Sequence, residues 1–320
     1  MDVTSLEWTI TMVVAIVILV FDVFWIAHRP HEPTIRETAL ALTFYIALAL
    51  AFGLYVWLHH GGTYGMEFLA GWITEYSLSI DNLFIFILIM TSFKVPRVYQ
   101  QEALMVGIVL ALILRGIFIA VGAAAIAHFA WVFYIFGGFL LVTALRLIAS
   151  KDDDSGRDNF VVRVARRRLP MSDEWAGLRL WVRRNNATLL TPMFLVILAL
   201  GSTDLLFAID SIPAIFGLTQ QAYLVFAANA FALMGLRQLY FLLGGLLRRL
   251  VYLTVGLSVI LAFIGVKLVL HALAANDVPF INGGRGVPVP EIPTVWSLGV
   301  IIGVLLVTAG ASLVRTRNAR

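Results

Sequence analysis

The chain of 320 residues contains no cysteine, which excludes disulfides and thiolate metal sites. Charged residues are scarce: they make up 13% of the chain, whereas about a quarter of a typical soluble domain is charged. Lysine occurs only three times and no G-x-x-x-x-G-K-[ST] loop is present, so the sequence does not support an ATP-driven pump. A nucleotide fingerprint and a pair of haem ligands at helix centres are missing too, which makes a redox enzyme the least supported class.

Apolar residues, in contrast, make up 61% of the chain and form long runs. Runs that can cross about 30 Å of hydrocarbon predict an all-α polytopic membrane protein, a single transmembrane domain with about nine helices. The basic residues lie between these runs, as topology determinants do, so the high isoelectric point does not indicate nucleic-acid binding. The predicted helices cover residues 8–27, 38–58, 67–92, 103–125, 129–149, 190–216, 222–247, 251–272 and 294–314.

The distribution of basic residues predicts the orientation in a bacterial cell membrane. With the N-terminus outside, the inner segments hold 18 basic residues and the outer segments hold one, Arg285. We therefore expect a cytoplasmic C-terminus and a cytosolic linker at 150–189. No basic residue precedes the first apolar run, so the first helix is expected to be retained rather than cleaved as a signal peptide. Asp22, towards the inner end of that helix, is expected to be an interfacial acid.

A short acidic motif occurs twice within apolar helices. Residues 74–82 read TEYSLSIDN and residues 203–211 read TDLLFAIDS. The two acids are six residues apart in both copies, Glu75 to Asp81 and Asp204 to Asp210. Because an acid at the centre of a bilayer helix costs about 3 kcal/mol on insertion scales, four such acids indicate function.

The helices after each motif also correspond. The segment ALILRGIF contains Arg115 and LMGLRQLYF contains Arg237, while TALRLI and IGVKLV end the third helix of each unit. The first motif helix is expected to run from outside to inside and the second in the opposite direction. The segments 67–149 and 190–272 are therefore predicted to form an inverted repeat of three-helix units, flanked by peripheral helices. Such repeats place a substrate site near the membrane midplane.

The segments EYSLSIDNLFIF, STDLLFAIDSIPAIFGLT, LRQLYFLLGG and VILAFIGVKL resemble the signature segments of the TerC family. The family includes the pH-inducible Alx proteins. The resemblance implies an integral membrane protein that handles divalent metals, chiefly by manganese export, with older links to tellurium resistance. It also marks Glu75, Asp81, Asp204 and Asp210 as the matched acids. Family members often carry a further Glu where this chain has Gly201, so affinity or selectivity is expected to differ.

Helix geometry limits how these acids can share an ion. Six residues of regular helix rotate by about 240° net and rise by about 9 Å, so both acids of one motif cannot ligate one ion from an unbroken helix. Either one acid from each motif holds the ion, or the helices unwind locally. Pro213 favours a break in the second motif helix, which would free backbone carbonyls as ligands.

We predict Asp81 and Asp210 as the direct ligands, with Glu75 and Asp204 as ligands on the way into the site or as proton carriers. The further candidate oxygen donors are Asn82, Ser211 and Asn229. Carboxylate and amide oxygens suit Mg²⁺, Ca²⁺ and Mn²⁺, and only the resemblance selects Mn²⁺ over Ca²⁺. The histidines fall near predicted helix ends, at positions 28, 31, 59, 60, 128 and 271, so a Zn²⁺ site inside the membrane is not favoured.

The plain structural role for the acids is salt bridging to Arg115 and Arg237. Two arginines against four acids leave about two negative charges, which a divalent cation or two protons would cancel. Lys267 is expected either to reach the outer surface or to help expel the cation, and Arg146 to reach the inner surface.

Carboxylates that bind either metal or protons can exchange one for the other, with the two units rocking around the site. The sequence therefore predicts a secondary transporter that is not an enzyme, has no prosthetic group and exchanges a divalent metal ion for protons. A transporter of another ion such as Ca²⁺, or an assembly factor that supplies metal to exported proteins, remains open. The pattern GVIIG at 299–303 would suit a homo-oligomer and equally packing within one chain.

Overall fold

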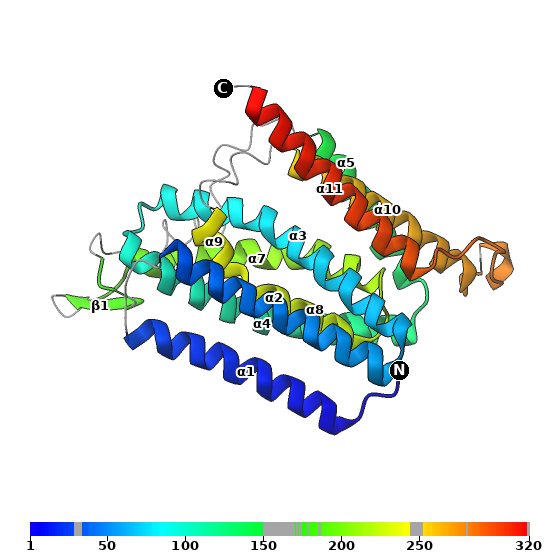
Figure 1. Cartoon of the computed structure of the whole chain (residues 1–320), viewed down its shortest axis with the longest axis horizontal. Helices are drawn as coiled ribbons and strands as arrows, with labels where there is room; N and C mark the ends of the chain where they lie inside the picture. Colours follow the sequence, from blue (N-terminus) through cyan, green and yellow to red (C-terminus); the bar gives the residue numbers. More distant parts are fainter. Residues whose placement is uncertain are drawn as a thin grey trace.

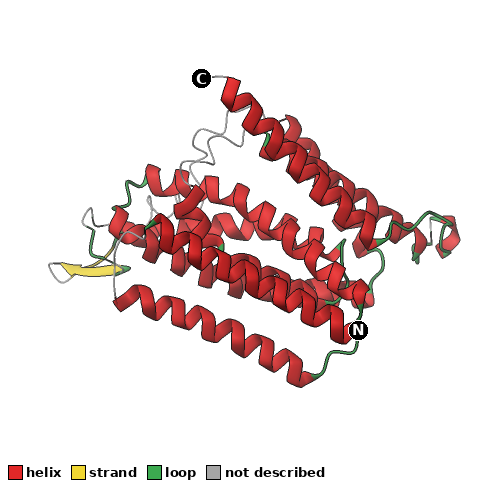
Figure 2. Ribbon diagram, viewed as in Figure 1, coloured by secondary structure: helices red, strands yellow, loops and turns green. Residues whose placement is uncertain are grey.

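The computed structural model describes residues 1–28, 34–149, 170, 172, 175–177, 179–184, 187–243, 252–279 and 281–318. Nearly all of the regular structure in this part is helical (Figure 2). The helices are α1 Ser5–His28, α2 Ile35–His60, α3 Gly62–Ser92, α4 Arg97–His128, α5 Val132–Ala149, α7 Pro192–Phe216, α8 Ala222–Met234, α9 Leu236–Leu243, α10 Leu253–Ala274 and α11 Thr294–Asn318.

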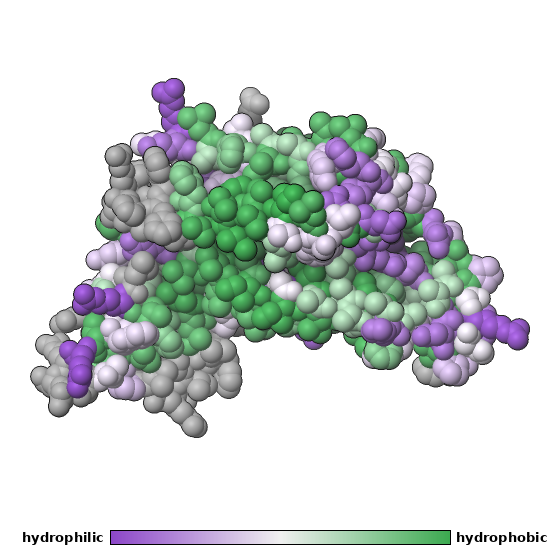
Figure 3. All heavy atoms as spheres, turned by 90° about the horizontal axis from the view of Figure 1, so that it is seen from below, coloured by the Kyte–Doolittle hydropathy of each residue, from purple (hydrophilic) through white to green (hydrophobic). Residues whose placement is uncertain are grey.

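Each of the nine predicted ranges holds a helix, and the prediction of an all-α polytopic membrane protein is confirmed. Within the described ranges, seven helices are long and apolar enough to cross a membrane, and α1 and α5 contain shorter apolar stretches. The count of nine spans and the inverted repeat stay predictions. Many large apolar side chains are exposed, as lipid-facing side chains would be. In Figure 3, hydrophobic residues fill much of the middle of the face, and most hydrophilic residues lie towards its two ends.

Three details differ from the prediction. The predicted helix 222–247 lies within the described residues only up to 243, and this part consists of α8 and α9. The helix is interrupted at Gly235, where a Cβ atom would lie 3.1 Å from the Tyr76 hydroxyl. The predicted break at Pro213 is wrong, since α7 continues through this residue to Phe216. A proline one turn before a helix end removes only one intrahelical hydrogen bond.

The third difference concerns the linker at 150–189, most of which lies outside the described residues. Its described part includes a small antiparallel hairpin of β1 (Trp181–Arg184) and β2 (Ala187–Leu190), which was not predicted. Thr191 follows β2 directly and Pro192 takes the first position of α7, where its fixed φ and missing N–H are tolerated.

Local sequence explains where other helices begin. Thr34 and Glu37 form a capping box at the start of α2, each side chain bonding the other's backbone N–H. Gly61 separates α2 from α3 with φ of 105°, a conformation that L side chains rarely adopt. The tight reversal from α2 into α3 brings the N-terminal end of α3 to the same end of the molecule as the N-terminus (Figure 1).

The helices of the two motif-containing units pack against one another in matched pairs. α3 packs on α8 and α7, α4 packs on α7 and α8, and α5 lies along α10 (Figure 1). If α3, α4 and α5 correspond to α7, α8 and α10, exchanging the units turns the α3–α8 contact into the α7–α4 contact. This is the packing that a two-fold relation between the units would give.

Candidate functional site

A buried arginine connects four helices at the centre of the molecule. Arg115 of α4 donates two hydrogen bonds to Asp204 of α7, from Nε to Oδ2 at 3.2 Å and from Nη2 to Oδ1 at 3.0 Å. Its Nη1 donates to Oδ1 of Asn229 in α8 at 3.4 Å and forms an ion pair with Oε1 of Glu75 in α3. Each helix unit therefore contributes charged or polar groups to one cluster, which we call the Arg115 cluster: Glu75, Arg115, Asp204 and Asn229.

The Arg115 cluster is sealed from the surface. The relative exposure of Glu75 is 0%, and that of Arg115, Asp204 and Asn229 is 1% each. With both acids ionised, one guanidinium against two carboxylates leaves one negative charge. A buried charge without a partner is costly, so the loss of Arg115 would strongly destabilise the folded protein, because both carboxylates would lose their counter-charge. Salt bridging of a motif acid to Arg115 was the plain structural role expected from the sequence, and the structure places Arg115 against one acid of each motif.

The two motif helices run in opposite directions. The N-terminal end of α3 meets the C-terminal end of α7, because Thr219 donates a hydrogen bond to Glu67 at 2.7 Å and a Cβ atom on Gly71 would lie 3.3 Å from Ile215 Cγ2. Both helices are continuous through their motifs. The alternative in which the motif helices unwind is therefore wrong, and the requirement for one acid from each motif remains.

Counting residues along the two antiparallel helices groups the backbones of the four acids into two layers. At 1.5 Å per residue, counted from the Gly71–Ile215 contact, Glu75 lies about 6 Å along α3 and Asp210 about 7.5 Å along α7 in the same direction. By the same count, the backbone of Asp81 lies about 15 Å and that of Asp204 about 16.5 Å from the contact. The layer nearer the Gly71–Ile215 contact, which we call the outer layer after the predicted orientation, contains Glu75 and Asp210. The other, the inner layer, contains Asp81 and Asp204, and the Arg115 guanidinium contacts one acid of each.

The side chain of Asp81 lies outside the described residues, so its pairing with Asp210 stays a prediction. The backbone heights favour Glu75 with Asp210 and Asp81 with Asp204 instead. Asp210 is partly buried, in contrast to Asp204. Among the described residues, no three His, Asp or Glu side chains lie close enough together to hold a metal ion.

Several buried polar atoms near the motifs have no hydrogen-bond partner within the described protein. They include Glu75 Oε2, Asn229 Nδ2 and Ser211 Oγ, together with the hydroxyls of Thr74 and Ser79. Nearly all buried polar groups in folded proteins are satisfied by protein atoms, water or ions. This concentration of unsatisfied groups on α3, α7 and α8 therefore fits a region that accommodates water or a hydrated ion.

The remaining predicted residues occupy different places. Asn82 is buried on α3 with 6% exposure, and Ser211 on α7 with 1%. Arg237 is partly buried near the start of α9. Lys267 lies away from the Arg115 cluster, where its Nζ donates to Ser297 Oγ at 3.1 Å in a cavity at one end of the molecule.

The sequence alone did not identify Arg115 as the group that joins Glu75 to Asp204. The available signal was the recurrence of an arginine one helix after each motif, which indicated charge balance without fixing the partner. It also missed Glu67 and Thr219, which lie just before the first motif and just after the second. A polar residue at each of these places was a signal for contact once the antiparallel arrangement was assumed.

The chain is similar in sequence to known integral membrane proteins. The Integral membrane protein TerC family matches residues 60–320. An uncharacterized membrane protein of Mycobacterium tuberculosis (strain H37Rv) is 47% identical over 99% of this chain and 81% of its own length. Another uncharacterized membrane protein, from Myxococcus xanthus, is 35% identical over 98% of this chain and 93% of its own.

A third relative, from Escherichia coli K12, is 35% identical over 95% of this chain and 93% of its own length, and is named "Putative membrane-bound redox modulator Alx". No solved structure matches the chain.

Proposed function

The chain belongs to the TerC family of integral membrane proteins, and on that premise we propose that it is a secondary transporter that exports divalent cations, chiefly Mn²⁺, in exchange for protons. The observation that carries the proposal is the Arg115 cluster, in which acids from both motifs meet at a junction of four buried helices. Ionisable residues within membrane-spanning helices generally serve ion pathways or proton relays.

Charge balance supports a divalent cation. The four motif acids and the two arginines Arg115 and Arg237 sum to two negative charges when all are ionised. One divalent cation cancels this charge, and so do two protons. Binding of either species thus excludes the other, which is the basis of exchange.

The donor chemistry supports a hard cation. Carboxylates, the amides of Asn82 and Asn229 and the hydroxyl of Ser211 offer oxygen ligands, which Mn²⁺, Mg²⁺ and Ca²⁺ prefer. We assign the cation first to the inner layer of Asp81 and Asp204 and then to the outer layer of Glu75 and Asp210. This assignment replaces the pair Asp81 and Asp210, because it places one acid of each motif at the same height.

Arg115 acts in this proposal as a tethered cation. Its guanidinium holds Asp204 and Glu75 while no metal occupies the layer concerned, and an entering metal ion competes with it for these carboxylates. A proton arriving from outside on the outer layer weakens metal binding there and favours release. The predicted orientation, with the N-terminus outside the bacterial inner membrane, places the outer layer on the side of release.

Three other functions have less support. Ca²⁺ export would use the same oxygen donors, so the choice of Mn²⁺ depends on the family resemblance. The name of the E. coli relative refers to redox modulation, but this chain has no cysteine and cannot itself carry out thiol–disulfide exchange. An assembly role would require surface contacts, for which the linker at 150–189 is the segment to delete.

The test is Mn²⁺ flux in proteoliposomes under an imposed pH gradient. We expect the wild-type chain to move Mn²⁺ in the direction opposite to the proton flow. Asp81→Asn and Asp204→Asn should stop this movement. Asp277→Asn, which changes an exposed acid beyond α10, is the matched control and should retain flux. Flux that does not depend on the pH gradient would rule out the exchange mechanism.

A further inference from the structure

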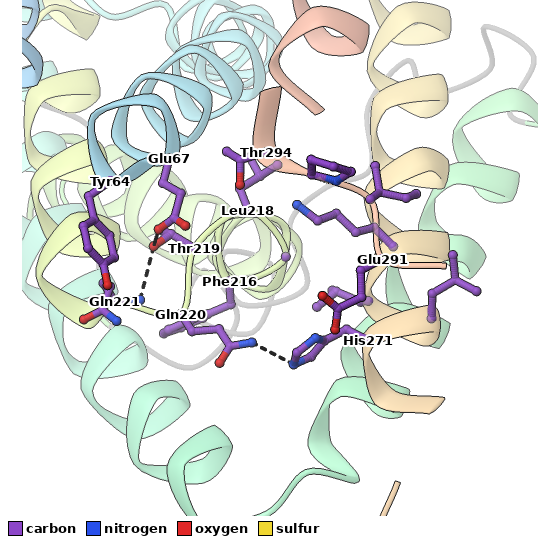
Figure 4. A pocket seen from close by; sticks show the side chains of 16 residues that line it. Tyr64, Glu67, Phe216, Leu218, Thr219, Gln220, Gln221, His271, Glu291 and Thr294 are labelled. Atoms are coloured by element: carbon purple, nitrogen blue, oxygen red, sulfur yellow. Dashed lines mark hydrogen bonds between the residues drawn. The ribbon is translucent and has the colours of Figure 1, made fainter. Parts of the chain in front are cut away.

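A cavity of about 530 Å³ opens at the end of the molecule where α3 begins and α7 and α10 end. It is separate from the Arg115 cluster, and its lining is rich in polar and charged side chains (Figure 4). The lining groups that matter here are Glu67, Thr219, Gln220, Lys267, His271 and Glu291.

Hydrogen bonds hold the polar groups of this cavity in place. The Glu67 carboxylate accepts from the buried Thr219 hydroxyl at 2.7 Å, and Lys267 Nζ is held by Ser297 at 3.1 Å. Gln220 Nε2 lies 2.7 Å from His271 Nε2, and Glu291 lies beside this imidazole in Figure 4. Oxygen acceptors therefore face the cavity from α3 and from the segment before α11, and a cation faces it from α10.

A layer of apolar side chains closes the cavity towards the Arg115 cluster. Ala70, Ile215, Phe216 and Leu218 are at most 3% exposed, and Phe216 and Leu218 also line the cavity. Glu67 precedes Glu75 by eight residues, which is about 12 Å along α3. The cavity therefore lies nearer the N-terminal end of α3 than the two layers of acids, and buried apolar side chains separate it from them.

We propose that this cavity is the vestibule in which a hydrated divalent cation binds at Glu67 after it leaves the outer layer, a proposal that rests on the transport function above. The volume fits a hydrated ion, because six waters at about 30 Å³ each occupy roughly 180 Å³. Among the described residues no three His, Asp or Glu side chains converge on one point, so the ion keeps its water and contacts the protein through hydrogen bonds. Ions such as Mg²⁺ commonly bind in this way, through one or two carboxylates and several waters.

Lys267 gives the vestibule its low affinity. Its positive charge shares the cavity with Glu67 and opposes a bound cation, so the ion is released to the outside rather than retained. The vestibule therefore binds the cation only transiently. The opposite charges of Glu67 and Lys267 determine how long the cation stays bound.

The absence of cysteine makes the test direct. In Thr294→Cys the single thiol lies at the start of α11 in the lining of the cavity. A membrane-impermeant thiol reagent is applied from each side of the membrane, with and without Mn²⁺, and the ratio of the two labelling rates is measured. We expect labelling only from the side that bears the N-terminus, and slower labelling when Mn²⁺ is present.

The protection by Mn²⁺ should be lost when Glu67→Gln is added and kept when Asp277→Asn is added, since Asp277 is an exposed acid at the same end but outside the lining. Glu67→Asp keeps the carboxylate and should keep part of the protection, which would show that substitution at this position does not by itself abolish the site. Lys267→Gln should bring about protection at lower Mn²⁺ concentrations. Protection that survives Glu67→Gln, labelling that ignores Mn²⁺, or labelling from the opposite side would overturn the proposal. The assay needs no flux, so a wild-type chain that shows protection without Mn²⁺ transport would contradict the transport function and leave the cation site standing.

Discussion

The Arg115 cluster makes a strong prediction for the substitution Arg115→Gln. The change removes two hydrogen bonds to Asp204, one to Asn229 and the ion pair with Glu75, all at 1% exposure or less. Because two carboxylates then remain buried without their counter-charge, we expect a loss of about 3–5 kcal/mol in the free energy of unfolding. The corresponding fall in melting temperature is about 5 °C.

Thermal unfolding of the purified protein in detergent measures this loss, with and without Mn²⁺. A ligand that binds only the folded state stabilises it by about 2.7 kcal/mol at 100 times its Kd. Because Mn²⁺ would replace the missing positive charge, it should stabilise Arg115→Gln more than the wild type. Arg285→Gln, at an exposed residue between α10 and α11, is the matched control and should change stability by about 0.5 kcal/mol or less. If Arg115→Gln melts like the wild type without Mn²⁺, the ion pairs do not balance the buried acids and the reasoning fails.

Two further predictions concern glycines at close helix contacts. A Cβ atom on Gly137 would lie 2.7 Å from Val269 Cγ2 and 2.9 Å from the Gly265 oxygen. Gly137→Ala should therefore lower the free energy of unfolding by about 1–3 kcal/mol, measured by thermal unfolding. Gly138→Ala, where a Cβ atom would meet no atom within 4 Å, should be neutral or slightly stabilising. Equal effects at both positions would contradict the close α5–α10 packing. A Cβ atom on Gly201 would clash with Leu110 Cδ2, so Gly201→Glu should destabilise the protein. Adding Leu110→Ala should recover part of the loss. A double-mutant cycle should give a coupling of about 0.5–3 kcal/mol, and strict additivity would count against this contact.

The helices were predictable because long apolar runs with few charges have one stable arrangement in a bilayer. Their ends were less predictable, since the limits of α3 and α4 extend beyond the apolar runs into polar residues. Pro213 illustrates the limit of local rules: the sequence indicates a break, but a proline near the last turn is tolerated. The interruption at Gly235 coincides with the close approach of Tyr76 from α3, a tertiary contact that no local pattern contains.

For the candidate site, the repeated motif identified the acids but not their partners. Which acid faces which depends on the relative heights of α3 and α7, and the sequence contains no direct record of those heights. The contact between Gly71 and Ile215 supplies this height, and it changes the favoured pair from Asp81 with Asp210 to Asp81 with Asp204. The predicted unbalanced negative charge remains the basis of the transport proposal.

The most direct test of the central claim compares Mn²⁺ flux of the wild type, Asp204→Asn and Asp277→Asn in proteoliposomes with an imposed pH gradient. The exchange mechanism predicts gradient-driven Mn²⁺ movement in the wild type and in Asp277→Asn, and none in Asp204→Asn. Equal Mn²⁺ movement in all three proteins, or movement that persists without a pH gradient, would contradict it.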